Sequence, residues 1–115
     1  MEMKFRGIDI KTGEMVFGGG IDSQRDTPII INHGVRYFVD AKTVGMFTGL
    51  KDKNSVEIYA GDIFFDGIEN CTIEWCDNSA SFIANDGTEK HELGEWTQRE
   101  LIIGNIHQNP ELLEP

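Results

Sequence analysis

Glycines that alternate with apolar residues are the feature that most constrains how this chain can fold. Two segments show it, residues 44–63 and residues 102–113, and the glycines concerned are Gly45, Gly49, Gly61 and Gly104. Glycine permits backbone conformations that other residues avoid, so the chain can turn tightly while neighbouring apolar side chains still reach a core. The pattern predicts short buried strands joined by tight turns.

The rest of the chain has the same character. Runs of apolar and β-branched residues are separated by turn residues at intervals of about 8–12 residues, which favours a small barrel or sandwich. Residues 29–31 and 35–39 flank Asn32-His33-Gly34, and residues 71–75 and 80–85 flank another turn, so two hairpins are predicted.

We therefore predict a mainly β protein, in which short antiparallel strands form a partly open SH3-like barrel with little helix. The barrel is expected at about residues 44–108, and residues 1–43 are expected to pack on it as extra strands of a single domain, residues 1–115. One helical turn is expected at residues 111–113. In the second hairpin, Trp75 shares a face with Ile73 and is predicted to lie in the core.

The length of the chain and its N-terminal sequence limit the classes of protein to which it can belong. The chain has 115 residues, which fits one domain with a substantial core. It lacks a basic leader followed by an apolar stretch, and no window approaches the roughly 18 apolar residues that span a bilayer. We expect a cytoplasmic protein with no membrane partner. The cysteines, Cys71 and Cys76, are expected to be free thiols, buried or half-buried.

The charge is unevenly distributed along the chain. Residues 1–57 contain eight Lys/Arg and eight Asp/Glu, whereas residues 58–115 contain two basic and twelve acidic residues, so the second half carries the whole net charge of −10. Such a half repels phosphate backbones and attracts a cationic partner. The simplest interpretation is a solvated surface. The functional hypothesis is a partner-binding surface for a basic protein, with duplex-DNA mimicry as one version; its candidate residues are Trp96, Glu74, Glu89, Glu92 and Glu95.

Three sequence runs together resemble the YopX family of phage and prophage proteins: Phe47-Thr48-Gly49-Leu50-Lys51-Asp52, then Ile58-Tyr59 with Gly61-Asp62-Ile63, then Gly104-Asn105-Ile106. The resemblance implies a small β protein, encoded by a phage or prophage in a bacterial host cell, with no established activity, and it transfers no catalytic residue. Its structural motif residues here are Gly45, Gly49, Asp52, Tyr59, Gly61, Asp62, Gly104 and Asn105. The family usually has glycine after the asparagine of its turn, but Ser55 follows Asn54, which favours a longer loop over a tight turn.

The sequence contains few residues that could form a catalytic or metal-binding site. Asp62 follows a glycine at a turn, where a carboxylate accepts backbone N–H bonds, and this structural role is favoured over catalysis. The spacing of His33, His91 and His107 matches no ligand motif. No catalytic residue, metal or cofactor is predicted.

The leading hypothesis is a non-enzymatic phage accessory protein that binds a protein partner or itself, with Ile29-Ile30-Ile31 as a segment suited to strand pairing. Two alternatives remain open. One is a nucleic-acid-binding barrel that uses basic residues of the first half, which are Lys4, Arg6, Lys11, Arg25, Arg36, Lys42, Lys51 and Lys53. The other is an enzyme with paired carboxylates and a divalent metal.

Overall fold

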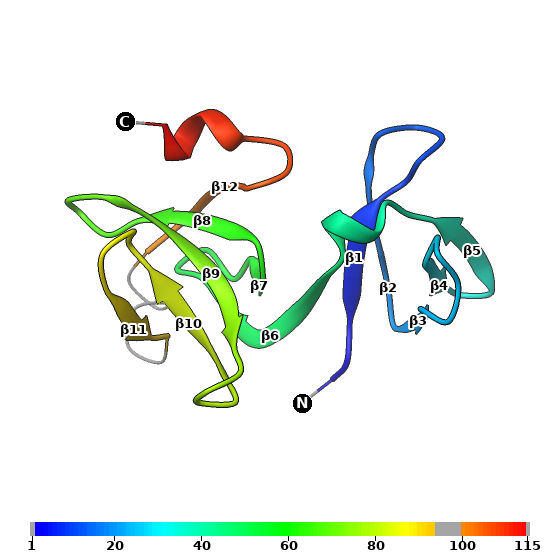
Figure 1. Ribbon diagram of the computed structural model, residues 1–115, viewed down its shortest axis with the longest axis horizontal. Coiled ribbons are helices and arrows are strands. Elements are labelled where there is room, and N and C mark those ends of the chain that lie inside the picture. Colours follow the sequence, from blue (N-terminus) through cyan, green and yellow to red (C-terminus); the bar gives the residue numbers. More distant parts are fainter. Residues whose placement is uncertain (1, 94–99, 115) are drawn as a thin grey trace. The chain divides into compact units, whose positions relative to one another are not determined.

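The computed structural model describes residues 2–93 and 100–114, and its regular structure is almost entirely strand (Figure 1). The helical segments in these ranges are two short 3-10 turns, η1 (Ala41–Thr43) and η2 (Pro110–Leu113). The predicted helical turn at residues 111–113 is therefore confirmed.

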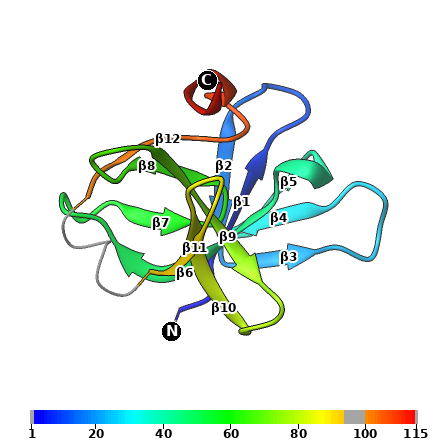
Figure 2. The ribbon, with the colours of Figure 1, turned by 60° about the vertical axis from the view of Figure 1, so that its left-hand side comes forward.

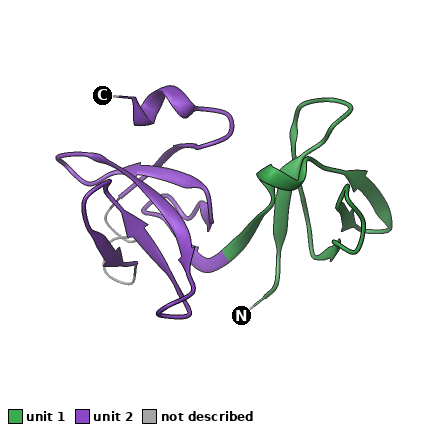
Figure 3. Cartoon of the chain, viewed as in Figure 1, with its two compact units in different colours: residues 1–47 green, residues 48–115 purple. Residues whose placement is uncertain are grey.

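The chain forms two compact units, residues 1–47 and residues 48–115 (Figure 3). Strand β6 (Gly45–Lys51) begins in the first unit and ends in the second. The expectation that residues 1–43 pack on the barrel within a single domain stays a prediction.

Unit 1 contains five short strands and the start of β6. The strands are β1 (Phe5–Ile8), β2 (Met15–Gly18), β3 (Gly20–Asp22), β4 (Ile29–Asn32) and β5 (Val35–Phe38). Strand β1 pairs with β2 and with the beginning of β6, while β3, β4 and β5 form a separate antiparallel sheet.

The core of unit 1 lies where the backbone of β2 approaches β4. A Cβ atom on Gly18 would lie 2.3 Å from the carbonyl oxygen of Ile31, so only glycine fits there. Ile29, Ile30 and Val39 are fully buried. The apolar segment at residues 29–31 does pair as a strand, but because β4 is the central strand of its sheet its partners are β3 and β5, and it offers no edge to a second copy. Homo-oligomer formation by another surface stays a prediction.

The hairpin of β4 and β5 is confirmed, and its turn explains its sequence. His33 and Gly34 both have positive φ angles, 49° and 81°, as the two central residues of a type I′ turn require. Asn32 and Val35 are directly paired across the strands, so the connection has only these two residues.

The described residues of unit 2 contain the end of β6 and six further strands. These are β7 (Glu57–Tyr59), β8 (Asp62–Phe65), β9 (Asn70–Cys76), β10 (Ser81–Asn85), β11 (Lys90–Glu92) and β12 (Ile102–Asn105). Five of them form one antiparallel sheet in the order β11-β10-β9-β8-β12, and β8 to β11 run side by side in two views (Figures 1 and 2).

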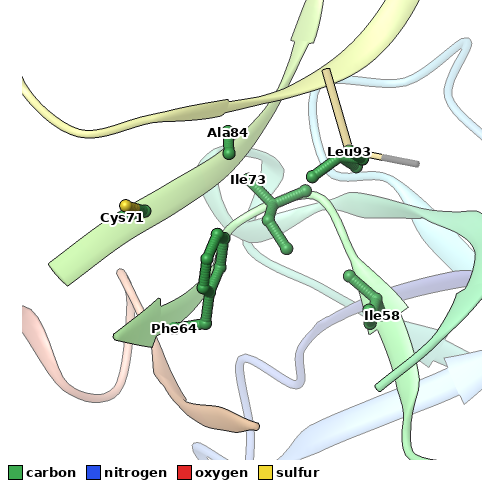
Figure 4. Close-up of a cluster of buried hydrophobic side chains, with 6 residues drawn as sticks. All are labelled: Ile58, Phe64, Cys71, Ile73, Ala84 and Leu93. Atoms are coloured by element: carbon green, nitrogen blue, oxygen red, sulfur yellow. The ribbon is translucent and has the colours of Figure 1, made fainter. Parts of the chain in front are cut away.

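The core of unit 2 lies on one face of this sheet, which curls around it. Cys71 and Ile73 from β9, Phe64 from β8 and Ala84 from β10 meet Ile58 from β7 (Figure 4). Leu93 is part of the same buried cluster, and Leu50, Phe82 and Ile102 pack against it. Since β7 closes part of the open side, the prediction of a mainly β protein with short antiparallel strands in a partly open barrel is confirmed.

The predicted burial of Trp75 is wrong. Its side chain does share a face with Ile73, but 49% of it is exposed, because it lies near the end of β9 beyond the buried cluster. The alternation of side chains along a strand shows which face of the sheet a residue is on. Whether that residue is buried also depends on whether other residues cover the sheet at that position.

The loop between β6 and β7 is longer than a two-residue turn, as the serine at position 55 predicted. The backbone N–H of Asp52 donates to the carbonyl of Val56, and Ser55 alone in this loop has a positive φ, of 65°. Ser55 therefore occupies a left-handed conformation that favours glycine.

Replacing Ser55 with glycine should raise the free energy of unfolding by about 0.5–1 kcal/mol, because the relief of a left-handed serine exceeds the added entropy of the unfolded chain. Chemical denaturation followed by circular dichroism measures the change. The matched control is Ser23→Gly, at an exposed position without positive φ, which should lower stability. Equal effects of the two substitutions would contradict this explanation.

Candidate functional site

A pocket of about 650 Å³ lies on unit 2. Two hairpin loops and the C-terminal 3-10 turn surround it; its lining residues are Ile68, Glu69, Asn70, Thr72, Asn85, Asp86, Gly87, Leu112, Leu113 and Glu114. None of these residues is basic.

The floor of the pocket is the outer face of β9 and β10. Thr72 and Asn85 are directly paired across these strands. Their neighbours Ile73 and Ala84 point the other way, into the core. The same two strands thus supply an apolar inner face and a polar pocket floor.

Two loops of the same sequence type flank the floor. Asp66-Gly67-Ile68-Glu69 joins β8 to β9, and Asp86-Gly87-Thr88-Glu89 joins β10 to β11. Both glycines have left-handed φ angles, 100° for Gly67 and 97° for Gly87. Because successive antiparallel strands reverse direction, the two loops lie at the same end of the sheet.

Each loop is organised by its aspartate. Asp66 Oδ1 accepts hydrogen bonds from the backbone N–H groups of Ile68 and Glu69, at 2.8 and 2.7 Å. Asp86 Oδ1 accepts from the N–H groups of Thr88 and Glu89, at 2.8 and 2.7 Å, and from the Thr88 hydroxyl. Both aspartates therefore have a structural role as loop caps.

The second carboxylate oxygen of each aspartate contacts the residue five positions later. Asp66 Oδ2 lies 3.5 Å from Cys71 Sγ, and Asp86 Oδ2 lies 3.3 Å from His91 Nε2. The loops differ in this partner, a buried thiol in one and a half-buried imidazole in the other, and in their third residue, Ile68 or Thr88.

The hydrogen bonds keep both aspartates ionised. The backbone N–H groups of Glu69 and Glu89, as the largest influences, lower the pKa of Asp66 and of Asp86 respectively. Burial, together with the charge of Asp66, raises the pKa of Cys71 to about 12. The pocket end of the sheet therefore contains fixed negative charge and a thiol that stays protonated at neutral pH.

Asp86, Glu89 and His91 form the described group whose spacing comes nearest to a metal site, with ligand atoms within 4.8 Å of one another. One oxygen of Asp86 already accepts three hydrogen bonds within its loop, so the loop itself explains the proximity. The proximity of these three side chains therefore does not by itself indicate a metal site. That the protein binds no metal stays a prediction.

The C-terminal wall depends on the sequence around Gly104. Asn109 Oδ1 accepts a hydrogen bond from the N–H of Asn105, and a Cβ on Gly104 would lie 2.6 Å from that oxygen. Asn105 Oδ1 accepts from the N–H groups of His107 and Gln108. This turn leads into η2, which Asn70 holds against the sheet by donating to the carbonyl of Leu112 at 2.6 Å.

The rim combines apolar and acidic side chains. Ile68 is 85% exposed and Leu113 is 43% exposed. Glu69 and Glu114 are exposed beside them. An apolar rim with carboxylates suits a ligand that has both an apolar and a cationic part.

The predicted partner-binding residues that the structure describes do not line this pocket; they lie in the strands and the loop next to it. Glu74 and Glu92 are both paired with Ile83 and share the outer face, and Glu89 ends the second loop. Glu74 contacts Asn85 Nδ2 at 3.4 Å and Lys90 Nζ at 3.8 Å. Glu95 and Trp96 lie outside the described residues.

Most of the predicted structural motif residues are buried, but Gly49 is exposed within β6 and Gly104 is half-buried within β12. Tyr59 and Asp62 are 2% exposed, and Asp62 Oδ2 accepts a hydrogen bond from the Tyr59 N–H at 2.8 Å. Gly45 pairs with Arg6, and left-handed φ angles of 86° and 97° occur at Gly49 and Gly61.

Sequence reasoning missed the pocket, although the sequence contained its signal. The pattern Asp-Gly-x-Glu occurs at residues 66–69 and again at residues 86–89, each time between two strand-like runs. In an antiparallel sheet, loops that follow every second strand lie at the same end of the sheet, so two loops with the same sequence pattern are expected to lie close together.

Stability should decrease at acid pH through Asp86. Its folded-state pKa lies below the usual 3.8, so its stabilising contribution is present above pH 3.8 and is lost as the pH falls toward the folded-state value. The difference in unfolding free energy between wild type and Asp86→Asn should therefore shrink between pH 7 and pH 3. Urea denaturation at both pH values measures it, and a constant difference would contradict the role of the charge.

The two thiols should react at different rates. Hydrogen bonds from Ser79 lower the pKa of Cys76, whereas Cys71 is buried and its pKa is raised. Because the thiolate is the nucleophile, iodoacetamide at pH 8 should alkylate Cys76 well before Cys71. Mass spectrometry of peptides from a glutamate-specific protease, which cleaves between the two cysteines at Glu74, measures the order over time, with Cys76→Ser as the control that leaves only the slow site. Equal rates would contradict the burial of Cys71.

Comparison with known proteins supports one assignment. No helix among the described residues is long and apolar enough to span a membrane. No curated protein matches the chain. The crystal structure of protein EF1440 from Enterococcus faecalis is similar, with a TM-score of 0.57 and 25% identity over 97% of this chain and 98% of that one. Residues 4–114 match the family described as YopX protein, and the chain belongs to the YopX family.

Proposed function

We propose that this chain is a non-enzymatic binding module that takes a basic segment of a partner protein on unit 2. The observation that carries the proposal is the pocket, where Glu69, Asp86 and Glu114 border a polar floor and no described lining residue is basic. We call the pocket and the neighbouring glutamates the acidic face; these glutamates are Glu74, Glu89 and Glu92.

The acidic residues of unit 2 have two different roles, and this difference supports the binding of a cationic partner. Asp66 and Asp86 cap their loops, so they contribute fixed charge. Glu69 and Glu114 are exposed at the rim, where a cationic side chain from outside can approach them. Pairs of this kind contribute to orientation and association rate more than to affinity.

The apolar rim supplies a second source of affinity. Ile68 projects almost completely into solvent, and Leu113 is also exposed. Covering such side chains contributes roughly 25 cal/mol for each Å² of apolar surface removed from water. A partner segment with a bulky apolar residue next to lysine or arginine would engage both features.

Binding fits the site better than catalysis does. The aspartates are occupied by loop hydrogen bonds, and the Cys71 thiol is buried and protonated at neutral pH. A catalytic carboxylate or thiol needs an accessible reactive form. Together with the resemblance to phage and prophage proteins, this supports an accessory protein that acts by capturing a partner.

A defined peptide tests the proposal. A fluorescein-labelled hexapeptide of alternating lysine and leucine should bind in anisotropy titrations, and its affinity should fall between about 0.05 and 0.3 M salt because exposed charges are screened. The same peptide with glutamate in place of lysine should not bind. Duplex DNA of about 20 base pairs serves as the competing ligand class.

Substitutions locate the binding surface. Glu69→Gln combined with Glu114→Gln should weaken peptide binding about fivefold, as expected for the loss of two exposed charge pairs. The matched control, Glu14→Gln with Asp26→Asn, removes the same charge from exposed positions of unit 1 and should leave affinity unchanged. Equal effects of the two double variants, or binding of DNA in place of the peptide, would refute the proposal.

A further inference from the structure

We propose that unit 2 has a second binding site, in which Trp75, Phe82 and Asp77 hold the guanidinium group of an arginine in a partner protein. These three residues, which we call the aromatic site, lie near the hairpin turn between β9 and β10. None of them lines the pocket, which lies at the other end of these strands, so this proposal does not rest on the proposed function.

Trp75 is exposed although its strand face is apolar. It lies two residues after Ile73, which is 1% exposed, yet half of its own side chain contacts solvent. Phe82 is its direct partner across the strands. The ring centroids are 5.0 Å apart with an interplanar angle of 74°, an edge-to-face contact that restrains the indole.

Asp77 restrains the indole from the turn. The Trp75 Nε1–H donates to Asp77 Oδ1 at 2.8 Å, so one hydrogen bond orients the ring and the carboxylate together. Asp77 is itself exposed, as are its neighbours Asn78 and Ser79. The site therefore presents a held aromatic ring directly beside a carboxylate before any partner arrives, which lowers the entropic cost of binding.

A planar cation is complementary to this arrangement. The face of an indole attracts cations more strongly than other aromatic rings do, and a carboxylate accepts hydrogen bonds from a guanidinium. Arginine can stack on the ring and donate to Asp77 simultaneously, whereas the ammonium of lysine is a more strongly hydrated point charge. Arginine and tryptophan are also enriched among residues that dominate interface energies.

The hairpin provides no competing cation on this face. Lys90 is the basic residue within residues 58–93, and its Nζ lies 3.8 Å from Glu74. Glu74 precedes Trp75 in β9, so it points to the opposite face of the sheet. Its pairing with Lys90 keeps that cation away from Asp77.

Proton–nitrogen NMR of the full chain tests the site through the indole N–H resonance of Trp75, assigned by its loss in Trp75→Phe. The probes are three acetylated and amidated tripeptides with a glycine on either side of arginine, lysine or citrulline. Arginine should produce a saturable shift, lysine a weaker response, and citrulline none, because citrulline keeps the planar shape without the charge. Asp77→Asn should weaken arginine binding about fivefold, in line with a cation–π and carboxylate contact at an exposed site.

The pocket variant Glu69→Gln with Glu114→Gln is the control and should bind the arginine peptide like wild type, which separates this site from the acidic face. The proposal is overturned by an unshifted Trp75 resonance, by an equal response to citrulline, or by wild-type affinity in Asp77→Asn. A shift that depends on protein concentration without peptide also overturns it, because a second copy would then occupy the site. If Asp77→Asn disturbs folding, the arginine–citrulline comparison on wild type still decides the question.

Discussion

The carboxylate of Asp52 joins the two ends of unit 2, and the position of the pocket depends on it. Only 7% of Asp52 is exposed. Its Oδ1 accepts hydrogen bonds from the N–H groups of Asn54 and Val56 within the β6–β7 loop, and its Oδ2 accepts from the N–H of Ile102, fifty residues later. A carboxylate buried to this degree is stable only with such donors. Strand β12 is thereby held in place, and the chain leaves it toward the turn that forms the pocket wall.

Aspartate carboxylates that accept hydrogen bonds from backbone N–H groups also occur at the surface, where they shape two loops. Asp66 and Asp86 each accept backbone hydrogen bonds that close a loop, and the glycine after each aspartate adopts the left-handed conformation that the loop needs. Local rules thus build two equal loops. Both loops stand at one end of the sheet, where Ile68 and Glu69 of the first loop and Asp86 of the second line one pocket. The other end of the same hairpin carries Trp75 and Asp77, so the two surfaces that we propose as binding sites share the strands β9 and β10.

Much of the fold was predictable from the sequence because its turns are local. His33-Gly34 and the glycines of the two Asp-Gly loops mark their turns by conformational preference alone, and Ser55 in place of glycine marked a longer loop. Trp75 was predicted wrongly because a strand's periodicity does not report where the covering layer ends. The pocket was missed for a related reason: its lining comes from residues 68–72, 85–87 and 112–114, which local patterns treat separately.

The amino-acid sequence by itself determined the mainly β class, the positions of the hairpins and the concentration of negative charge after residue 57, since these follow from backbone preference, side-chain alternation and composition. Only the tertiary structure decided which carboxylates are bound by backbone N–H groups and which face solvent, and which aromatic side chains remain uncovered. The physical reason is that burial and hydrogen-bond partners depend on contacts between distant residues, such as Asp52 with Ile102 and Asn70 with Leu112. No local pattern contains those contacts.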